Sequence, residues 1–466
     1  MSIKMFRSVS RRSVVPTCSL VLGLLGVTLP AQESPVPAIR TPVEALDLYR
    51  LEQPVDPQLA PDGRTIAVLR QTRDINTDRV NHEIWLVGVA DGARRMLVGA
   101  DRAPGGVRWS PDGSRLAFIG REGGKPQVLV VEIADGRVRA VTDSPQPPRS
   151  LSWSPDGRSI AYVALVERQP EAFYSLPEKP AAAQWAPPAR VIQTYPYRTD
   201  SQGWLTPGDT QVFVVGAEGG ASRQITRGSG DWGARDEAPA WLPDGSAVIV
   251  SGDTDPAARR RANQSDLWLW PTAEGSAPRQ LTRDDGSEQS PAVSPDGARV
   301  AYVGWRSRRN SYQRNDIFVM PLSAATAARN LTQTLDRNTE QPRWREDGAG
   351  LHFLYQDQGV NRVGFVDAGG AAKLQIRVAE VGNTRLLLPS SGGGSYSAAR
   401  GVFAYPSVEA DRPAALAVDE GRGERILWDL NTAWRESRDI GRLEEIWVKS
   451  SADRRAVHGW ILYPPG

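Results

Sequence analysis

The chain has 466 residues, of which 40% are hydrophobic and 24% are charged, with 44 glycines and 36 prolines. This composition is typical of a soluble all-β protein with many turns, and the net charge of +2 gives no argument for nucleic-acid binding. The only cysteine, Cys18, excludes a disulfide framework.

The first 31 residues have the layout of a secretory signal. Basic side chains, among them Arg11 and Arg12, precede an apolar run at 20–27, and Ala31 offers a small residue for cleavage. The run is too short for a stable membrane span, so we expect a signal peptide at 1–31 and a periplasmic or secreted mature protein. An uncleaved N-terminal anchor is the alternative.

Six copies of one short phrase follow a lead-in at 32–51. The copies are Leu59-Ala-Pro-Asp-Gly63, Trp109-Ser-Pro-Asp-Gly113, Trp153-Ser-Pro-Asp-Gly157, Trp241-Leu-Pro-Asp-Gly245, Val293-Ser-Pro-Asp-Gly297 and Trp344-Arg-Glu-Asp-Gly348. Their aspartates are separated by 50, 44, 88, 52 and 51 residues, and a period near fifty is typical of propeller blades. Ser-Pro-Asp-Gly suits a type I turn, and the aromatic or β-branched residues around it place that turn between two strands.

Each repeat predicts four strands. In the fourth repeat a strand at 247–251 follows the turn, and segments 266–270 and 279–282 complete the unit. The interval of 88 residues is one unit with a long insertion rich in proline and alanine, and a degenerate seventh unit begins at Gly394. The sequence therefore predicts an all-β fold, a seven-bladed β-propeller, across residues 52–430.

Residues suited to catalysis are scarce. The Gly-x-Ser-x-Gly elbow of an α/β-hydrolase does not occur in the sequence. The three histidines, His82, His352 and His458, are scattered, and the first two lie in predicted strands. They form no metal-binding pattern, and most carboxylates belong to Asp-Gly turns. We therefore predict no catalytic residue, no metal and no cofactor in this chain.

The tail, residues 431–466, differs from the repeats. After a linker, the segments 444–450 and 456–463 predict two strands around a polar turn. Two isolated strands are only marginally stable in water, so they look like the start of a second domain.

The ordered combination of repeats and tail resembles the N-terminal part of prolyl oligopeptidase family serine peptidases, in the branch of acylaminoacyl peptidases and dipeptidyl peptidases. Segments 47–50 and 55–59 are similar to that family's approach to blade one. Segment 197–203 resembles its third-blade insertion, and residues 444–466 resemble the first hairpin of its α/β-hydrolase domain.

This resemblance implies a propeller that caps a C-terminal α/β-hydrolase domain and limits access to short peptides. The chain would be the substrate-selecting portion of a secreted or periplasmic serine exopeptidase, whose catalytic triad would lie beyond residue 466. We therefore expect the chain alone to be inactive, whether it is a fragment or a natural truncation.

Two other classes of function remain open. A stand-alone TolB-like propeller would serve as a periplasmic protein-binding scaffold, although a scaffold has no need of a hydrolase-type hairpin. A propeller enzyme with its own site in the central channel would need convergent acids, a metal set or a nucleophile, and the sequence does not assemble one.

Two groups of side chains are candidates for binding substrate. Asp236 and Glu237, in a loop leading into blade four, loosely resemble the acidic residues with which family members hold a free amine; the alternative is a solvated acidic loop. Arg260 and Arg308 lie in loops between the second and third strands of neighbouring blades, where arginines should crowd together. They would steer peptide carboxylates or dock an acidic surface of the hydrolase domain, or they are solvated surface.

Overall fold

The computed structural model describes residues 40–465 with internal gaps. The gaps are 169–174, 176, 187–189, 193–196, 201–202, 229, 234–236, 254–263, 307–312, 324–326, 370–374, 379–393 and 410. The expected signal segment 1–31, Asp236, Arg260 and Arg308 thus lie outside the described residues. In the part of the chain that is described, no helix is long and apolar enough to cross a membrane.

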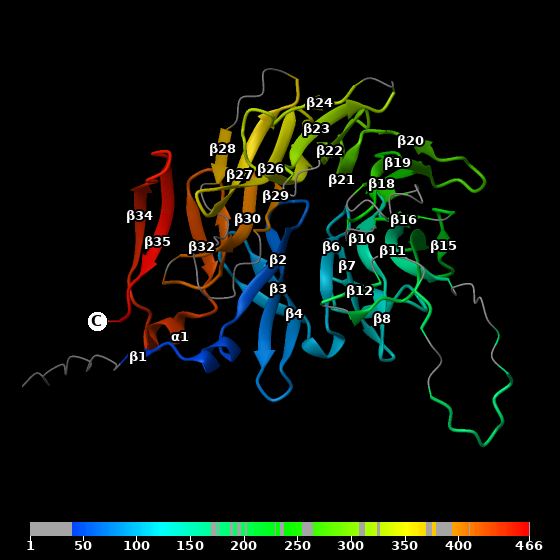
Figure 1. The fold of residues 1–466 in the computed structure, drawn as a ribbon, viewed down its shortest axis with the longest axis horizontal. Coiled ribbons are helices and arrows are strands. Elements are labelled where there is room, and N and C mark those ends of the chain that lie inside the picture. Colours follow the sequence, from blue (N-terminus) through cyan, green and yellow to red (C-terminus); the bar gives the residue numbers. More distant parts are fainter. Residues whose placement is uncertain are drawn as a thin grey trace, which may run out of the picture. The chain divides into compact units, whose positions relative to one another are not determined.

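Seven antiparallel sheets follow one another along the chain and form the blades of a β-propeller, which confirms the predicted fold (Figure 1). Blade one contains β2 (Gln53–Leu59), β3 (Thr65–Asp74), β4 (Arg79–Gly88) and β5 (Arg94–Val98). Blade two contains β6 (Gly105–Trp109), β7 (Arg115–Glu122), β8 (Lys125–Glu132) and β9 (Val138–Ala140). Blade three contains β10 (Arg149–Trp153), β11 (Ser159–Glu167), β14 (Gly208–Gly216) and β15 (Arg223–Gln224), with the small hairpin β12 (Arg198–Thr199) and β13 (Gly203–Trp204) in its insertion.

The remaining blades repeat this order. Blade four contains β16 (Asp231–Trp232), β17 (Ala240–Trp241), β18 (Ala247–Asp253), β19 (Asp266–Pro271) and β20 (Arg279–Gln280). Blade five contains β21 (Gly286–Val293), β22 (Arg299–Arg306), β23 (Asp316–Pro321) and β24 (Arg329–Asn330). Blade six contains β25 (Thr339–Trp344), β26 (Gly350–Asp357), β27 (Val360–Asp367) and β28 (Gln375–Val378), and blade seven contains β29 (Ser397–Ala399), β30 (Val402–Ser407), β31 (Ala415–Asp419) and β32 (Glu424–Trp428).

The turn phrase is built by its own side chains, as the sequence indicated. In blade two, Gly113 N–H donates to Ser110 O at 2.9 Å, and the Ser110 hydroxyl donates to Asp112 Oδ1 at 2.6 Å. These contacts hold the pKa of Asp112 down at about 2, with the serine hydroxyl as the main cause. In all six copies an oxygen of the aspartate accepts the N–H two residues later. The aspartates of the phrase are thus turn residues.

The tryptophan of the phrase joins neighbouring blades. Its indole N–H donates to a first-strand carbonyl of the preceding blade, from Trp109 to Gln58 O at 2.9 Å and from Trp153 to Arg108 O at 3.0 Å. The same bond recurs from Trp241 and Trp344. A buried indole N–H needs a partner, so this position couples packing between blades to a hydrogen bond.

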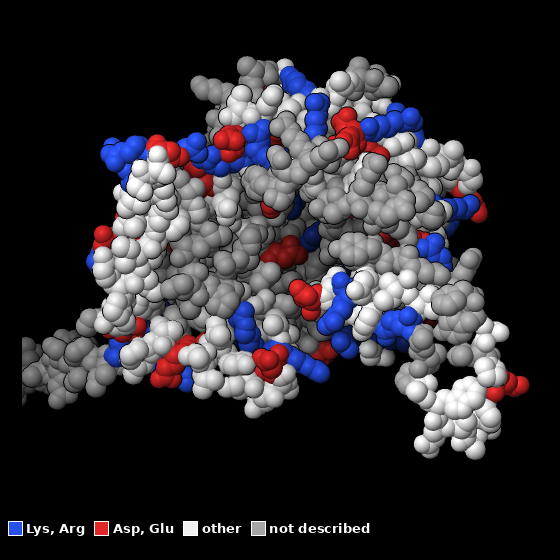
Figure 2. All heavy atoms as spheres, in the orientation of Figure 1, with Lys and Arg blue, Asp and Glu red and all other residues white. Residues whose placement is uncertain are grey.

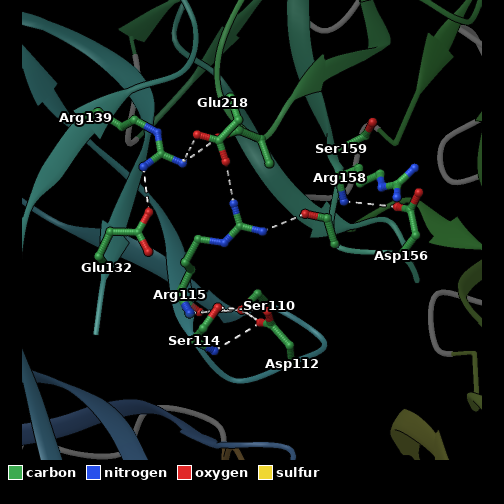
Figure 3. Close-up of polar contacts among 12 residues, drawn as sticks. Ser110, Asp112, Ser114, Arg115, Glu132, Arg139, Asp156, Arg158, Ser159 and Glu218 are labelled. Carbon is green, nitrogen blue, oxygen red and sulfur yellow. Dashed lines mark hydrogen bonds and ion pairs between the residues drawn. The ribbon is translucent and has the colours of Figure 1, made fainter. Parts of the chain in front are cut away.

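Charged side chains add to the junction between blades two and three (Figure 3). Arg115 donates to Glu218 Oε1 at 2.8 Å and to Gly157 O at 2.9 Å, so it reaches the turn of the next blade. Arg139 bridges the other oxygen of Glu218, at 2.9 Å, and Glu132, at 2.7 Å. Glu218 is mostly exposed, so the network contributes modestly to stability and mainly fixes the position of the blades.

The ring closes by packing between blades one and seven, because each blade consists of strands that are consecutive in the chain. A cluster of buried residues spans this junction, including Leu59 and Ile66 on one side and Leu416 and Val418 on the other. Figure 1 shows β2 next to β29 and β30. No strand is shared across the junction among the described residues, so burial of apolar surface carries the closure.

A buried ion pair fastens the lead-in to the linker. The segment β1 (Thr41–Pro42) pairs with β33 (Arg438–Asp439), and the 3-10 helix Ala45–Tyr49 carries Asp47. Two guanidinium nitrogens of Arg438, Nε and Nη2, donate to Asp47 at 2.7 and 2.8 Å, and they lower the pKa of that carboxyl to about 2. A second 3-10 turn, Ala100–Arg102, and the short helix α1 (Thr432–Ser437) complete the elements; the sequence analysis did not predict α1.

The tail forms the predicted hairpin, β34 (Leu443–Lys449) paired with β35 (Ala456–Leu462). One of its faces carries Trp447, His458 and Trp460, and Trp460 packs over Gly359, where an added Cβ would lie 2.5 Å from the indole. Alternation along the strands places Val448 and Val457 on the opposite face. These two valines are 53% and 48% exposed, so that face is apolar and uncovered in the described part of the chain.

Candidate functional site

The first strands of the blades line a central cavity of about 710 Å³. Its wall is formed mainly by residues four to seven positions before the turn aspartates of blades one, two, four, five and six: Asp56, Gln58, Arg108, Glu237, Ala238, Gln289, Ser290, Pro291, Glu340, Gln341, Pro342 and Arg343. Blade seven adds Ser395 and Tyr396. Figure 2 shows acidic side chains recessed in the hollow at the middle of this face.

A β-bulge turns side chains toward the cavity in five of the first strands. In each, the pairing register shifts around a residue with positive φ that lies six positions before the turn aspartate. These residues are Asp56, Gly106, Ser150, Ser290 and Gln341, with φ between 49° and 61°. A non-glycine residue in this region costs about 1–2 kcal/mol, and bulges redirect side chains, so three of these residues reach the cavity at an energetic cost. Blades four and seven lack this bulge: the first strand of blade four is divided into β16 and β17, and β29 of blade seven pairs with β30 without a register shift.

On one side of the cavity the charges are paired. Arg108 lies 3.0 Å from Asp56, whose other carboxylate oxygen accepts from Gln58 at 2.6 Å. Glu237 accepts from the hydroxyl of Ser251 at 3.1 Å. These acids are half-buried and held in place by an ion pair or by hydrogen bonds, so this part of the wall is polar and its acids have protein partners.

On the opposite side, β25 presents one acid and one base. Glu340 is exposed, and Arg343 is half-buried with its guanidinium 5.4 Å from the centre of the Tyr396 ring. The Tyr396 hydroxyl donates to Gln341 O at 3.0 Å, and full burial raises its pKa above the ordinary value. This wall thus offers two charges of opposite sign on a strand that is anchored from blade seven.

The four residues proposed from the sequence have different outcomes. Glu237 does lie on the wall of the cavity, and its role in binding stays a prediction. Asp236, Arg260 and Arg308 lie outside the described residues. Two other arginines of the loop that contains Arg308 are described. Arg314 forms an ion pair with Asp316 at 2.9 Å, and Arg306 is exposed at the end of β22.

Sequence reasoning overlooked most of the cavity wall because it searched the loops. The signal is nonetheless present: polar residues stand four to seven positions before each turn aspartate, inside strands whose other positions are apolar. Segment 340–343, Glu-Gln-Pro-Arg, is the most polar example. Among the described residues, no group of three or more His, Cys, Asp or Glu side chains could hold a metal ion.

No family model matches the chain. The uncharacterized peptidase YuxL of Bacillus subtilis is 25% identical over 440 residues, which are 91% of this chain and 64% of YuxL. The dipeptidyl-peptidase 5 of Porphyromonas gingivalis is 26% identical over 309 residues, which are 64% of this chain and 43% of that protein. That of Trichophyton equinum is 24% identical over 208 residues, 42% of this chain and 26% of that protein, so the chain spans less than two thirds of these relatives.

Solved structures show the same fold. An acylaminoacyl peptidase in complex with Z-Gly-Gly-Phe-chloromethyl ketone matches 88% of this chain and 58% of its own, with a TM-score of 0.65 and 18% identity. The β-propeller domain of the Trilobed protease from Pyrococcus furiosus, described as an open velcro topology, matches 82% of this chain and 97% of its own, with a TM-score of 0.55 and 14% identity. The chain is thus similar in sequence to peptidases, and it shares the propeller fold of an acylaminoacyl peptidase and of the Trilobed protease.

Proposed function

We propose that the chain is the substrate-selecting propeller of a secreted or periplasmic serine exopeptidase that acts on short peptides. Its partner would be a C-terminal α/β-hydrolase domain that supplies the catalytic triad. The names of the relatives, dipeptidyl-peptidase 5 and acylaminoacyl peptidase, support a peptidase that acts near peptide ends. The cavity lined by the first strands is the passage through which such a propeller would admit peptides.

The uncovered face of the hairpin carries this proposal. Val448, Val457 and Ile461 are 53%, 48% and 38% exposed, and they lie on one face of a two-stranded sheet. A hairpin of this kind is marginal in water unless further strands or a helix cover its apolar face. A hydrolase domain that continues this sheet would bury that face and would also pair the free edges of the two strands.

The alternative, a TolB-like propeller acting as a periplasmic binding scaffold, explains the blades equally well. It does not explain why the tail has apolar residues on an exposed face. The peptidase YuxL also aligns with 91% of the chain. We therefore favour the peptidase.

The coding DNA downstream of residue 466 provides the test. We expect an open frame that encodes a Gly-x-Ser-x-Gly elbow, and we expect the longer product to react with a fluorophosphonate probe. The 466-residue chain alone should stay unlabelled. Stoichiometric labelling of the chain alone would contradict the proposal, as would a downstream frame without a hydrolase elbow.

A substitution in the longer product tests whether the exposed apolar face of the hairpin contacts the hydrolase domain. Val448→Asp places a charge on the surface that the hydrolase domain would bury, so peptidase activity should fall at least tenfold. Arg454→Asp, in the turn of the same hairpin, is the matched control and should leave activity within twofold, because Arg454 is exposed. Equal activity of the two variants would show that the face does not dock the domain.

A further inference from the structure

The two charges that β25 presents to the cavity lack partners. No hydrogen bond or ion pair from the described residues reaches the side chain of Glu340 or Arg343; the Tyr396 ring lies beneath the guanidinium, and Arg343 Nε is buried without an acceptor. The other charged groups of the wall differ, since Asp56 pairs with Arg108 and Glu237 bonds Ser251. A buried donor without an acceptor is costly, so an unpartnered guanidinium at a cavity indicates that a ligand supplies the acceptor.

We propose that this side of the cavity is a binding station for a short peptide with free ends, such as a dipeptide. Glu340 binds the ammonium group, and Arg343 binds the carboxylate through its planar fork of donors. This inference rests on the proposed function, because it names which peptides the passage holds.

The charge pattern selects this ligand over others. A simple anion attracted by Arg343 would meet the like charge of Glu340, and a simple cation would meet Arg343. A peptide blocked at either end would leave one of the two charges unpaired. Only a molecule with both charges satisfies the acid and the base together.

The spacing fits one or two amino acids. Glu340 and Arg343 are three positions apart on an extended strand, which separates their backbones by at most about 10 Å. A dipeptide in extended form spans roughly 7 Å. The side chains of Glu340 and Arg343 are long enough to bring their charged groups to that separation. The cavity volume of about 710 Å³ is within the range of small-molecule sites, roughly 300–1,000 Å³.

The station is held in its shape before any ligand arrives. Gln341, between the two charged residues, has a φ of 52°, and its side-chain amide donates to Gly394 O at 3.2 Å. Tyr396 lies beneath the guanidinium and also bonds the backbone of Gln341. Anchoring from blade seven thus fixes the bulge that separates the acid from the base, and a pre-formed site loses less entropy on binding.

Titration calorimetry on the 466-residue chain tests the station with four probes: Ala-Ala, N-acetyl-Ala-Ala, Ala-Ala-amide and acetate. We expect Ala-Ala to bind at least tenfold more tightly than either capped form, and acetate to bind no better than the capped forms. Glu340→Gln and Arg343→Gln should each weaken Ala-Ala at least tenfold. Absence of Ala-Ala binding, or equal binding of the capped peptides, overturns the station.

Matched variants locate the binding. Glu346→Gln and Arg345→Gln remove the same charges just beyond the strand, where Arg345 pairs with Asp347 at 2.5 Å, and they should leave Ala-Ala affinity within twofold. Unchanged affinity in Glu340→Gln and Arg343→Gln, with wild-type melting temperatures, overturns the assignment. Dipeptide binding by a chain whose downstream frame encodes no hydrolase supports the station while contradicting the peptidase. An active peptidase whose propeller binds no dipeptide overturns the station alone.

Discussion

The junction between blades four and five and the junction between blades five and six have the same backbone but different charges. In both, a threonine two residues after the fourth strand accepts a backbone N–H of the third strand, from Leu267 to Thr282 at 2.8 Å and from Ile317 to Thr332 at 2.9 Å. In both, the next blade donates a backbone N–H back to the preceding loop, from Glu288 and from Thr339. The repeat therefore positions equivalent groups at equivalent places.

The side chains then diverge. At the junction between blades five and six, Arg314 binds Asp316 through two nitrogens, at 3.1 and 2.9 Å, and the facing residue is the neutral Thr339. At the junction between blades four and five, Gln264 occupies the position equivalent to Arg314, and Glu288 faces Asp266. One junction thus neutralises its acid with a cation, and the other places two acids together.

The second arrangement requires a proton. Glu288 is 2% exposed, and burial, followed by the charges of Asp266 and Asp284, raises its pKa from 4.5 to about 8. Burial likewise raises the pKa of Asp266. A neutral Glu288 can donate a hydrogen bond to Asp266, so the pair holds together as an acid and a carboxylate that share one proton. The comparison teaches that two junctions with the same backbone can differ in how their stability depends on pH.

The largest expected effect is a loss of stability with rising pH. The folded state holds the proton of Glu288 up to about pH 8, whereas the unfolded chain releases it near 4.5, so the free energy of unfolding falls as pH rises across that window. The loss between pH 5 and pH 9 should be on the order of 4 kcal/mol, measured by urea unfolding at pH 5, 7 and 9.

The variant Glu288→Gln is the control for this loss. It keeps the shape and hydrogen bonds of the protonated acid but cannot ionise, so the pH dependence should flatten over the same window. A profile as steep as that of the wild type would show that other groups cause the dependence.

Removing the cation from the other junction should have the next largest effect. Arg314→Met leaves Asp316, which is 7% exposed, without its bidentate partner, and we expect a loss of roughly 1–3 kcal/mol at pH 7. Arg345→Met, which breaks the exposed pair with Asp347, is the matched control and should cost less than about 1 kcal/mol.

Supplying a cation to the first junction should have a smaller and opposite effect. Gln264→Arg copies the position of Arg314, so it should stabilise the ionised forms of Asp266 and Glu288 and raise stability at pH 9 by about 1 kcal/mol. Gln264→Met adds a side chain of similar length without charge. If both variants behave alike, the equivalence between the two junctions is wrong.

Most of the fold was open to prediction, because the turn phrase specifies its geometry locally. Pro and Gly fix the turn, and the tryptophan three positions before the aspartate marks the contact with the preceding blade. The divided first strand of blade four and the helix α1 carried no comparable signal. Apart from Glu237, the candidate site was missed, because a bulge that turns Gln341 toward the cavity depends on pairing with β26, which a single strand does not reveal.

The smallest effect is expected at the outer edge of the junction between blades five and six. Asp336 lies 3.2 Å from Arg314 but is 83% exposed, so water and salt screen the pair. Asp336 has a φ of 54°, a conformation that asparagine also tolerates, and Asp336→Asn therefore changes the charge without straining the backbone. We expect a cost below about 0.5 kcal/mol that disappears in 1 M salt. Combining Asp336→Asn with Arg314→Met measures the coupling energy between Asp336 and Arg314 directly. A coupling energy as large as that between Arg314 and Asp316 would contradict the view that the burial of Asp316 makes its ion pair the stronger one.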